Sequence, residues 1–156
     1  MFEKITQWLS TAPAPADPVQ ARQLAMAVLL VEVGRADFDF DADERAQMQR
    51  LLIDGLHLSP EDARALLDQA VAESGAAVSL HGFIATLNAQ LDADGKRRLL
   101  QALWQVAYAD GQLSPQEEAR IRQLAELLYV SDADFVRTRL RIVAQASDNI
   151  TTASAV

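Results

Sequence analysis

The chain repeats itself after 73 residues, and this internal repeat limits its fold more than any other feature. Residues 103–118, LWQVAYADGQLSPQEE, align without a gap with residues 30–45, LVEVGRADFDFDADER. Self-similarity at a fixed period marks one supersecondary unit that is present more than once. The sequence therefore predicts two similar units, each built around an acidic turn. The identical pairs at this offset include Leu30/Leu103, Val33/Val106, Ala36/Ala109, Asp37/Asp110, Glu44/Glu117, Ala46/Ala119, Leu51/Leu124 and Leu67/Leu140.

The composition is that of one helical domain. A chain of 156 residues buries about two thirds of its unfolded surface, so a hydrophobic core alone can hold it together. Half of the residues are hydrophobic, only 6% are aromatic and six are glycine. Such alanine- and leucine-rich segments favour helices, and no stretch alternates long enough to predict a strand. We therefore expect an all-α fold.

Seven helix starts can be located from their caps. Asp or Ser at the cap, with an acid or amide three residues later and proline at the first helical position, is typical of a helix start. The five clearest starts are Asp17-Pro18 with Gln20, Asp41 with Glu44, Ser59-Pro60 with Asp62, Ser114-Pro115 with Glu117, and Ser131 with Asp134; Ser79 and Asp92 are weaker. The predicted helices are 18–36, 42–57, 60–74, 80–91, 93–109, 115–130 and 132–146.

The arrangement of these helices follows from their hydrophobicity and from the repeat. Residues 17–36 and 96–109 form the most apolar helices and occupy equivalent positions, so we place them together at the centre. Two helices from each repeat then surround this pair, and residues 80–91 connect the repeats. The predicted fold is a seven-helix bundle with an internal two-fold pseudo-repeat.

The first ten residues are expected to form a short amphipathic helix, separated from the bundle by a stiff Pro/Ala linker. This helix either folds back onto the bundle, which its lack of a basic face favours, or docks on a membrane or a partner protein. Its apolar residues are Phe2, Ile5, Trp8 and Leu9. The predicted parts of the chain are the amphipathic segment 1–10, the linker 11–17, the helical domain 18–146 and a flexible tail 147–156.

Charge and residue types exclude several classes of function. The formal net charge of -8 disfavours nucleic acid and anionic membranes, and favours cations or basic partners. Without cysteine there is no disulfide, no thiolate zinc site and no cysteine nucleophile. His57 and His81 form no metal-binding pair and are expected at the surface, and no phosphate loop or serine elbow is present. We expect neither enzymatic activity nor a small-molecule substrate.

The protein is expected in the cytoplasm, where it can also be a peripheral protein at the inner membrane. The longest apolar run, Ala25 to Val31, ends at Glu32 and is far shorter than the roughly 20 residues that span a bilayer. The first residues contain no apolar region of the length found in signal peptides. The expected partner is another protein, which is membrane-associated if the amino-terminal helix docks there. The oligomeric state stays open.

An alanine- and leucine-rich helix leads into Ala109-Asp110-Gly111, and Ala36-Asp37 repeats this pattern in degenerate form. Leu113, Ser114 and Glu117 follow, and then a helix with Ile121 and Leu124. This pattern resembles the TerB family of tellurite-resistance proteins, whose relatives include a helical domain in front of some J-domains, and the resemblance spans about residues 20–145. It implies a compact all-α fold, a cytoplasmic bacterial protein without known catalytic chemistry, and a role in metal-linked stress responses near the membrane. Phe38 departs from the pattern, since the family's turn usually has glycine there.

Asp37 and Asp110 are the leading candidate functional residues because they stand against a helix dipole at equivalent positions. Each follows the carboxyl end of an apolar helix, where the macrodipole disfavours an acid by a few tenths to about 1 kcal/mol. Three kinds of compensation are open: a cation shared with Glu44 and Glu117, an Asx turn onto the next backbone amides, or a salt bridge. The arginines available for such a bridge include Arg35, Arg120, Arg122, Arg137, Arg139 and Arg141.

If a metal binds, its predicted ligands are Asp37, Glu44, Asp110 and Glu117, and all-oxygen ligation favours Ca²⁺, Mg²⁺ or Mn²⁺. The first turn holds five acids in the eight residues 37–44. It is not an EF-hand, because alanine stands at its sixth position and methionine at its twelfth. Two hypotheses therefore remain: a cation-responsive site that reports to a partner, or a helical interaction scaffold in which the acids serve as helix caps.

Two further groups of residues are assigned structural roles. Arg137, Arg139 and Arg141 follow one another at alternate positions, so they do not share one helix face, and pairing with acidic residues of the chain is expected. Trp104 and Tyr108 are expected to pack on the central helix rather than to form a ligand cage.

Overall fold

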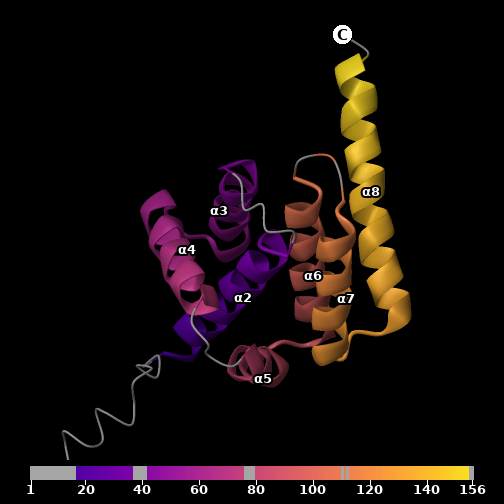
Figure 1. The fold of residues 1–156 in the computed structure, drawn as a ribbon. Helices are drawn as coiled ribbons and strands as arrows, with labels where there is room; N and C mark the ends of the chain where they lie inside the picture. The colour runs from indigo at the N-terminus through magenta and orange to yellow at the C-terminus, as the bar shows by residue number, and fades with distance from the viewer. Residues whose placement is uncertain (1–16, 37–41, 76–79, 110, 112, 155–156) are drawn as a thin grey trace, which may run out of the picture.

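The computed structural model describes residues 17–36, 42–75, 80–109, 111 and 113–154, and within these ranges every regular element is a helix (Figure 1). The predicted all-α helix bundle is confirmed for this part of the chain. The amphipathic segment 1–10 and most of the linker lie outside the described residues, so the prediction made for them stays a prediction. The helices are α2 (Pro18–Gly34), α3 (Ala42–Leu56), α4 (Pro60–Gly75), α5 (Leu80–Gln90), α6 (Ala93–Ala107), α7 (Pro115–Leu127) and α8 (Asp132–Ser154).

The helices begin at the residues that the cap patterns predict. Asp17 Oδ1 accepts from the Val19 amide at 2.9 Å, and Ser114 Oγ accepts from the Glu117 amide at 3.0 Å. Ser59 and Ser131 cap α4 and α8 in the same way, each at 3.1 Å. Asp92, predicted to be a weak cap, accepts from the Gly95 amide at 2.7 Å, the shortest of these cap bonds. Each of these bonds satisfies an amide that has no partner within its own helix.

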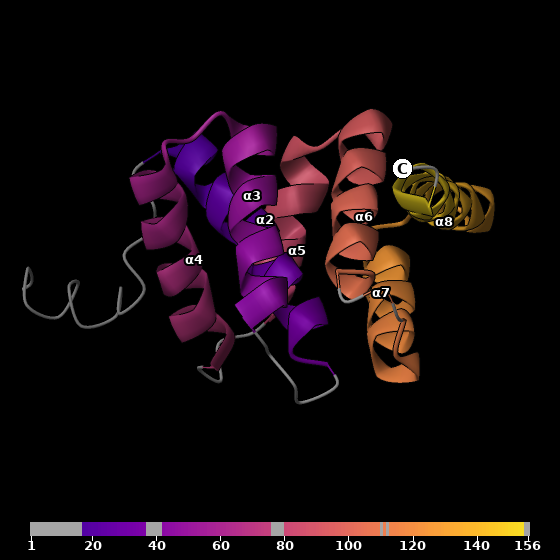
Figure 2. The same cartoon turned by 90° about the horizontal axis from the view of Figure 1, so that it is seen from above.

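Helix α2 lies at the centre of the molecule. It contacts α3, α4, α5, α6 and α7, and Figure 2 shows these helices arranged around it. A helix that is apolar on nearly all sides is stable only where neighbours cover all of those sides. Helix α6 packs beside α2 and also contacts α3, α7 and α8, so the predicted central pair is confirmed. The buried residues of α2 are Leu24, Ala25, Ala27, Val28, Leu29, Leu30, Val31, Val33 and Gly34.

Helix α8 is held on α6 by a buried aromatic contact. The Trp104 ring is fully buried and lies 5.3 Å from the Phe135 ring, centroid to centroid. Its Nε1–H donates to Thr138 Oγ1 at 3.2 Å, and the Thr138 hydroxyl donates to the Phe135 carbonyl oxygen at 2.9 Å. Trp104 thus satisfies its polar atom inside the core. The predicted packing role of this tryptophan agrees with these contacts.

The carboxyl ends of α2 and α6 share the same hydrogen bonds at repeat-equivalent positions. The Ala36 amide donates to the Val33 carbonyl at 3.1 Å, and the Ala109 amide donates to the Val106 carbonyl at 3.2 Å. Val33 and Val106 are both fully buried, as the repeat requires. These matches agree with an equivalence of the two helix ends, while the superposition of the complete repeats stays a prediction.

The third helices of the two repeats, α4 and α8, bury different faces. In α4 the apolar residues Ala63, Leu67 and Ala70 are fully buried, and α4 packs on α2. Their equivalents in α8 are Val136, Leu140 and Val143, which are exposed by 49%, 60% and 37%. Helix α8 instead buries Phe135, Thr138 and Ile142. Its buried face is displaced by about one residue, which is about 100° of rotation about the helix axis.

The difference between α4 and α8 has a physical cause on the central helices. Trp104 occupies the position equivalent to Val31, and both side chains are fully buried. The larger indole ring contacts Phe135 and Thr138, so the face of α8 that carries these two residues turns toward α6. Leu140 is thereby turned away from the core.

The predicted end of the last helix is wrong. Helix α8 continues to Ser154, beyond the predicted residue 146. No proline or glycine occurs between Asp132 and Ser154, so nothing in the backbone stops the helix earlier. In Figure 1 the end of α8 projects beyond the other helices. Within the described ranges, each helix falls short of the length or the hydropathy needed to cross a membrane.

The different environments of Leu67 and Leu140 can be tested by truncation. Leu67→Ala removes a fully buried side chain and should lower the free energy of unfolding by about 2–5 kcal/mol. The repeat-equivalent Leu140→Ala acts on a residue that is 60% exposed and should change it by less than about 0.5 kcal/mol. Urea unfolding of both variants measures the difference. Equal losses would contradict the orientation of α8.

Candidate functional site

Two buried carboxyl groups mark the candidate site. Glu44 and Glu117 are 2% and 1% exposed, and with Thr138 they are the buried polar side chains of the described residues. Each is the third residue of its helix, α3 or α7, and the two are equivalent in the repeat. A carboxylate is favoured at a helix amino terminus, but its burial is costly unless it is paired or bonded. Burial of both equivalents indicates a role that the two repeats share.

The turn before α7 requires a glycine. Gly111 has φ +83°, a left-handed conformation that other residues rarely adopt. Its amide donates to the Tyr108 carbonyl oxygen at 2.9 Å, which closes the turn after α6. Ser114 then caps α7 and fixes the first helical turn, which carries Glu117. The residue equivalent to Gly111 is Phe38, which lies outside the described residues.

The helices that carry the two glutamates converge on the same central pair. Helices α3 and α7 each contact both α2 and α6. In Figure 2 the carboxyl ends of α2 and α6 both lie toward the lower edge of the picture. The candidate site is therefore at the end of the bundle where the two central helices terminate.

The structure describes two of the four predicted metal ligands and does not test the metal site. Asp37 and Asp110 lie outside the described residues, whereas Glu44 and Glu117 are described and buried. The described ranges contain no group of three or more histidine, cysteine, aspartate or glutamate residues that could hold a metal ion. A site built from all four predicted ligands therefore stays a prediction.

Glu32 is a functional candidate that the sequence did not single out. Its carboxylate forms an ion pair with Arg120 of α7 and accepts from the Ser74 hydroxyl of α4 at 2.6 Å. The Glu32 side chain is 18% exposed and the Arg120 side chain 29%, so water screens this pair only partly. The sequence offers one indication of this role, because Glu32 is a charged residue that interrupts the longest apolar run. Glu32 joins three helices two residues before the end of α2.

The predicted arginines have several different partners. Arg139 pairs with Glu118 at 2.8 Å, in agreement with the expected pairing to an acidic residue. The Arg122 guanidinium lies over the Phe135 ring, with its central carbon 4.7 Å from the ring centroid. The prediction that Arg137, Arg139 and Arg141 share no face is wrong for two of them, because Arg137 and Arg141 line one groove. They are four residues apart, which places them on one side of a helix.

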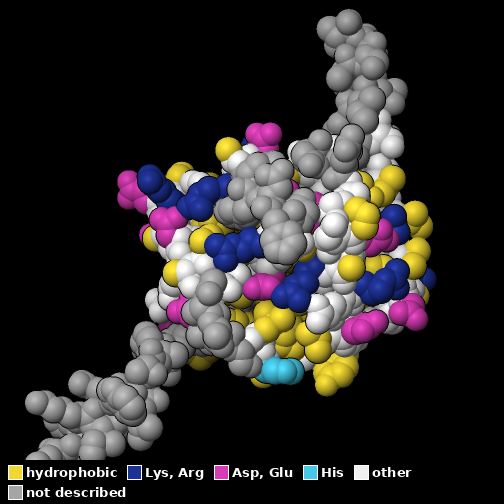
Figure 3. Space-filling view, viewed as in Figure 1, with side chains coloured by type: hydrophobic (Ala, Val, Ile, Leu, Met, Phe, Trp, Pro, Cys, Tyr) yellow, Lys and Arg dark blue, Asp and Glu magenta, His cyan; other side chains and the backbone are white. Residues whose placement is uncertain are grey.

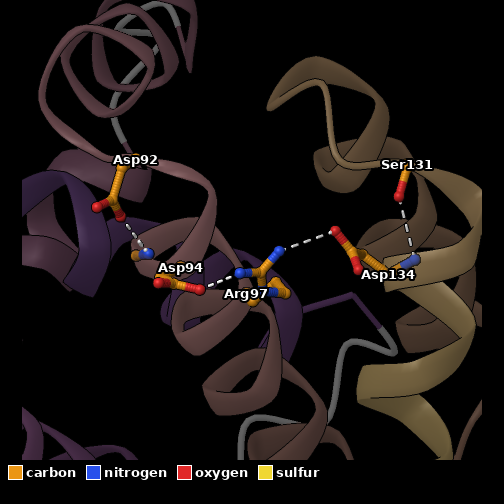
Figure 4. A network of polar contacts seen from close by, with 6 residues as sticks. Asp92, Asp94, Arg97, Ser131 and Asp134 are labelled. Atoms are coloured by element: carbon orange, nitrogen blue, oxygen red, sulfur yellow. Dashed lines mark hydrogen bonds and ion pairs between the residues drawn. The ribbon is translucent and has the colours of Figure 1, made fainter.

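This groove has a volume of about 550 Å³ and is lined by residues of both α6 and α8. Arg97 lines the groove, and Figure 4 shows its side chain between Asp94 of its own helix and Asp134 of α8. The distance from Arg97 Nη1 to Asp134 Oδ2 is 3.3 Å. The hydrogen bonds that the Arg97 guanidinium donates to Asp94 and Asp134 raise the pKa of Arg97 above its ordinary value. The residues that line the groove are Asp94, Arg97, Arg98, Gln101, Asp134, Arg137, Thr138 and Arg141.

Comparison with known proteins identifies one family. The model of the family described as Tellurite resistance protein TerB matches residues 23–140, from the first turns of α2 to the middle of α8. The match includes both acidic turns and both buried glutamates. No curated protein and no solved structure matches the chain.

Ser114 should prove important for the start of α7. Ser114→Ala removes the 3.0 Å cap bond to the Glu117 amide and should lower the free energy of unfolding by about 1 kcal/mol. Ser114→Thr keeps a capping hydroxyl and should recover most of this loss. Denaturant unfolding of the two variants measures both effects, and an equal loss in both would argue against the cap.

Proposed function

Because this chain belongs to the TerB family, we propose that it is a non-catalytic helical module of a bacterial tellurite and metal stress response. In this proposal its paired acidic turns bind a divalent cation, and the module docks a partner protein. The observation that supports cation binding most directly is the burial of Glu44 and Glu117 at equivalent positions, 2% and 1% exposed. Each of them follows an acidic turn at the end of a central helix.

Helix electrostatics support a cation at this end of the bundle. Helices α2 and α6 end at Gly34 and Ala107, and Asp37 and Asp110 follow each end by three residues. Helix carboxyl ends carry a partial negative charge, so acids placed there are destabilised unless positive charge is near. A hard ion such as Ca²⁺, Mg²⁺ or Mn²⁺ supplies that charge and prefers carboxylate oxygens.

A scaffold without metal is the second candidate function, and one observation favours it. Each glutamate stands at the third helical position, where an acid belongs to a capping box. Ser114 forms the serine half of such a box, because its hydroxyl accepts from the Glu117 amide. In this alternative the acids only stabilise the starts of α3 and α7, and the surface of the bundle binds the partner.

The proposed absence of catalysis and the proposed location are supported by sequence features. The chain has no cysteine, and His57 and His81 are both exposed. We place the protein in the cytoplasm, with a peripheral contact to the inner membrane through its partner or through the apolar face of residues 1–10. A partner that is itself membrane-associated would bring the bundle to that surface.

The cation proposal predicts a stability change that depends on two aspartates. Saturating Ca²⁺, Mg²⁺ or Mn²⁺ should raise the free energy of unfolding by about 2.7 kcal/mol at a hundredfold excess over Kd. Asp37→Asn and Asp110→Asn should each abolish this gain. Without metal these variants should be as stable as the wild type or slightly more so, because a charge opposed to a helix dipole is gone. The measurement is the melting temperature with each ion and with chelator.

Asp54→Asn is the matched control, since it removes one charge from an exposed position on α3. It should leave the response to metal intact. If Asp37→Asn and Asp110→Asn lose stability equally with metal and with chelator, the aspartates are bonded within the protein. That result rejects the cation site and supports the scaffold.

A further inference from the structure

Helix α8 carries an apolar stripe on its outer face. Val136, Leu140 and Val143 are exposed by 49%, 60% and 37%. They follow one another at intervals of four and three residues, the spacing of a helix-packing seam. Among the described residues, the other large hydrophobic side chains with comparable exposure are Val19 and Tyr129. Figure 3 shows hydrophobic side chains beside basic and acidic ones over α8, at the right of the molecule.

The first repeat indicates what kind of structure covers such a stripe. The equivalents of Val136, Leu140 and Val143 in α4 are fully buried, and helix α2 packs on α4. The stripe on α8 has an apolar residue at each of these positions. Because Trp104 turns α8 by about one residue, no helix of the described chain covers the stripe. Its spacing and its equivalents both fit a helix as the missing neighbour.

Positive charge borders the stripe on the side of α6. The groove between α6 and α8 is lined by four arginines and two aspartates. Arg97 pairs with both aspartates, whereas Arg98, Arg137 and Arg141 form no ion pair with any described residue. Arg137 and Arg141 stand one residue after Val136 and Leu140, so they lie along one edge of the stripe. A basic edge of this kind is unexpected in a chain with a net charge of -8.

We propose that the apolar stripe of α8 and the arginines of the adjacent groove bind an acidic amphipathic helix of another protein. The apolar face of the partner helix covers Val136, Leu140 and Val143. Its carboxylates, on one flank, reach the guanidinium groups of Arg98, Arg137 and Arg141. An amphipathic helix in a groove is a common mode of peptide recognition, and arginine is suited to carboxylates because it can bind them through two parallel hydrogen bonds.

Charge favours this occupant over two others. A second copy of the chain, packed antiparallel through the same face, would bring Arg137 and Arg141 of both copies together. An anionic lipid surface would be repelled by the net charge of -8 and by the exposed Asp94 in the groove. A single helix with acids on one flank places its charge only beside Arg98, Arg137 and Arg141, so the rest of the acidic surface, which is screened by salt, opposes it less than it opposes an extended anionic membrane.

This inference rests on the docking part of the proposed function and is independent of the cation. Its test is therefore carried out in chelator, where a failed cation site has no influence. The probe is a fluorescein-labelled synthetic 18-residue helix with leucine at the seam positions and glutamate on the flanks. A matched probe carries glutamine in place of each glutamate. Fluorescence anisotropy measures the binding of both probes to the full-length chain.

Charge reversal should locate the binding surface. The double variant Arg137→Glu/Arg141→Glu should weaken binding of the acidic probe at least tenfold. Arg50→Glu/Arg64→Glu makes the same change in net charge at exposed positions of α3 and α4, and it should stay within twofold of the wild type. Arg64 is also the repeat equivalent of Arg137. Leu140→Gln should weaken binding at least fivefold without unfolding the protein, because this side chain is 60% exposed.

Several results would overturn the proposal. They are the absence of binding to the acidic probe, equal binding of the glutamine probe, or equal weakening by the two double variants. Self-association that Leu140→Gln abolishes, seen by sedimentation velocity, would assign the stripe to a second copy. Binding to phosphatidylserine vesicles, lost in Arg137→Glu/Arg141→Glu while the acidic probe stays unbound, would assign it to a membrane.

Discussion

The structure depends on the burial of α2 on nearly all of its sides. Leu29, Val31 and Val33 are fully buried against neighbouring helices. Helix α2 can therefore lie only at the centre. The one acid inside its apolar run, Glu32, is held by Arg120 of α7 and Ser74 of α4. The Glu32 carboxylate therefore links α2 to α4 and α7, near the carboxyl end of α2 and the first acidic turn.

The second central helix is related to the first but has a different core residue. Where α2 has Val31, α6 has Trp104, whose ring contacts Phe135 and whose Nε1–H bonds Thr138. The indole ring is too large to leave the packing of the neighbouring helix unchanged. This difference between Val31 and Trp104 therefore explains why the equivalent helices α4 and α8 bury different faces. It also explains why an apolar stripe is left at the surface.

Local signals in the sequence predicted the features that are themselves local. Caps at Asp17, Ser59, Ser114 and Ser131 located helix starts, because a cap depends on residues three positions apart. The rotation of α8 could not be predicted in this way, since it depends on a contact between Trp104 and Phe135, on different helices. The burial of Glu44 and Glu117 was not predictable either, because the same capping pattern occurs at exposed helix starts, such as Ser59 with Asp62.

Helix α6 takes part in both proposed sites, and its length determines how they can influence each other. Its first turns carry Arg97 and Arg98, which line the groove, and it ends at Ala107, before the second acidic turn. Arg98 and Ala107 are nine residues apart, which is about 14 Å along the helix axis. This exceeds the Debye length of about 8 Å at physiological salt, so the exposed arginines do not neutralise that turn. Communication between a bound cation and a bound helix would have to pass through the packing of α6 against α2 and α8, because direct attraction between the two sites is screened.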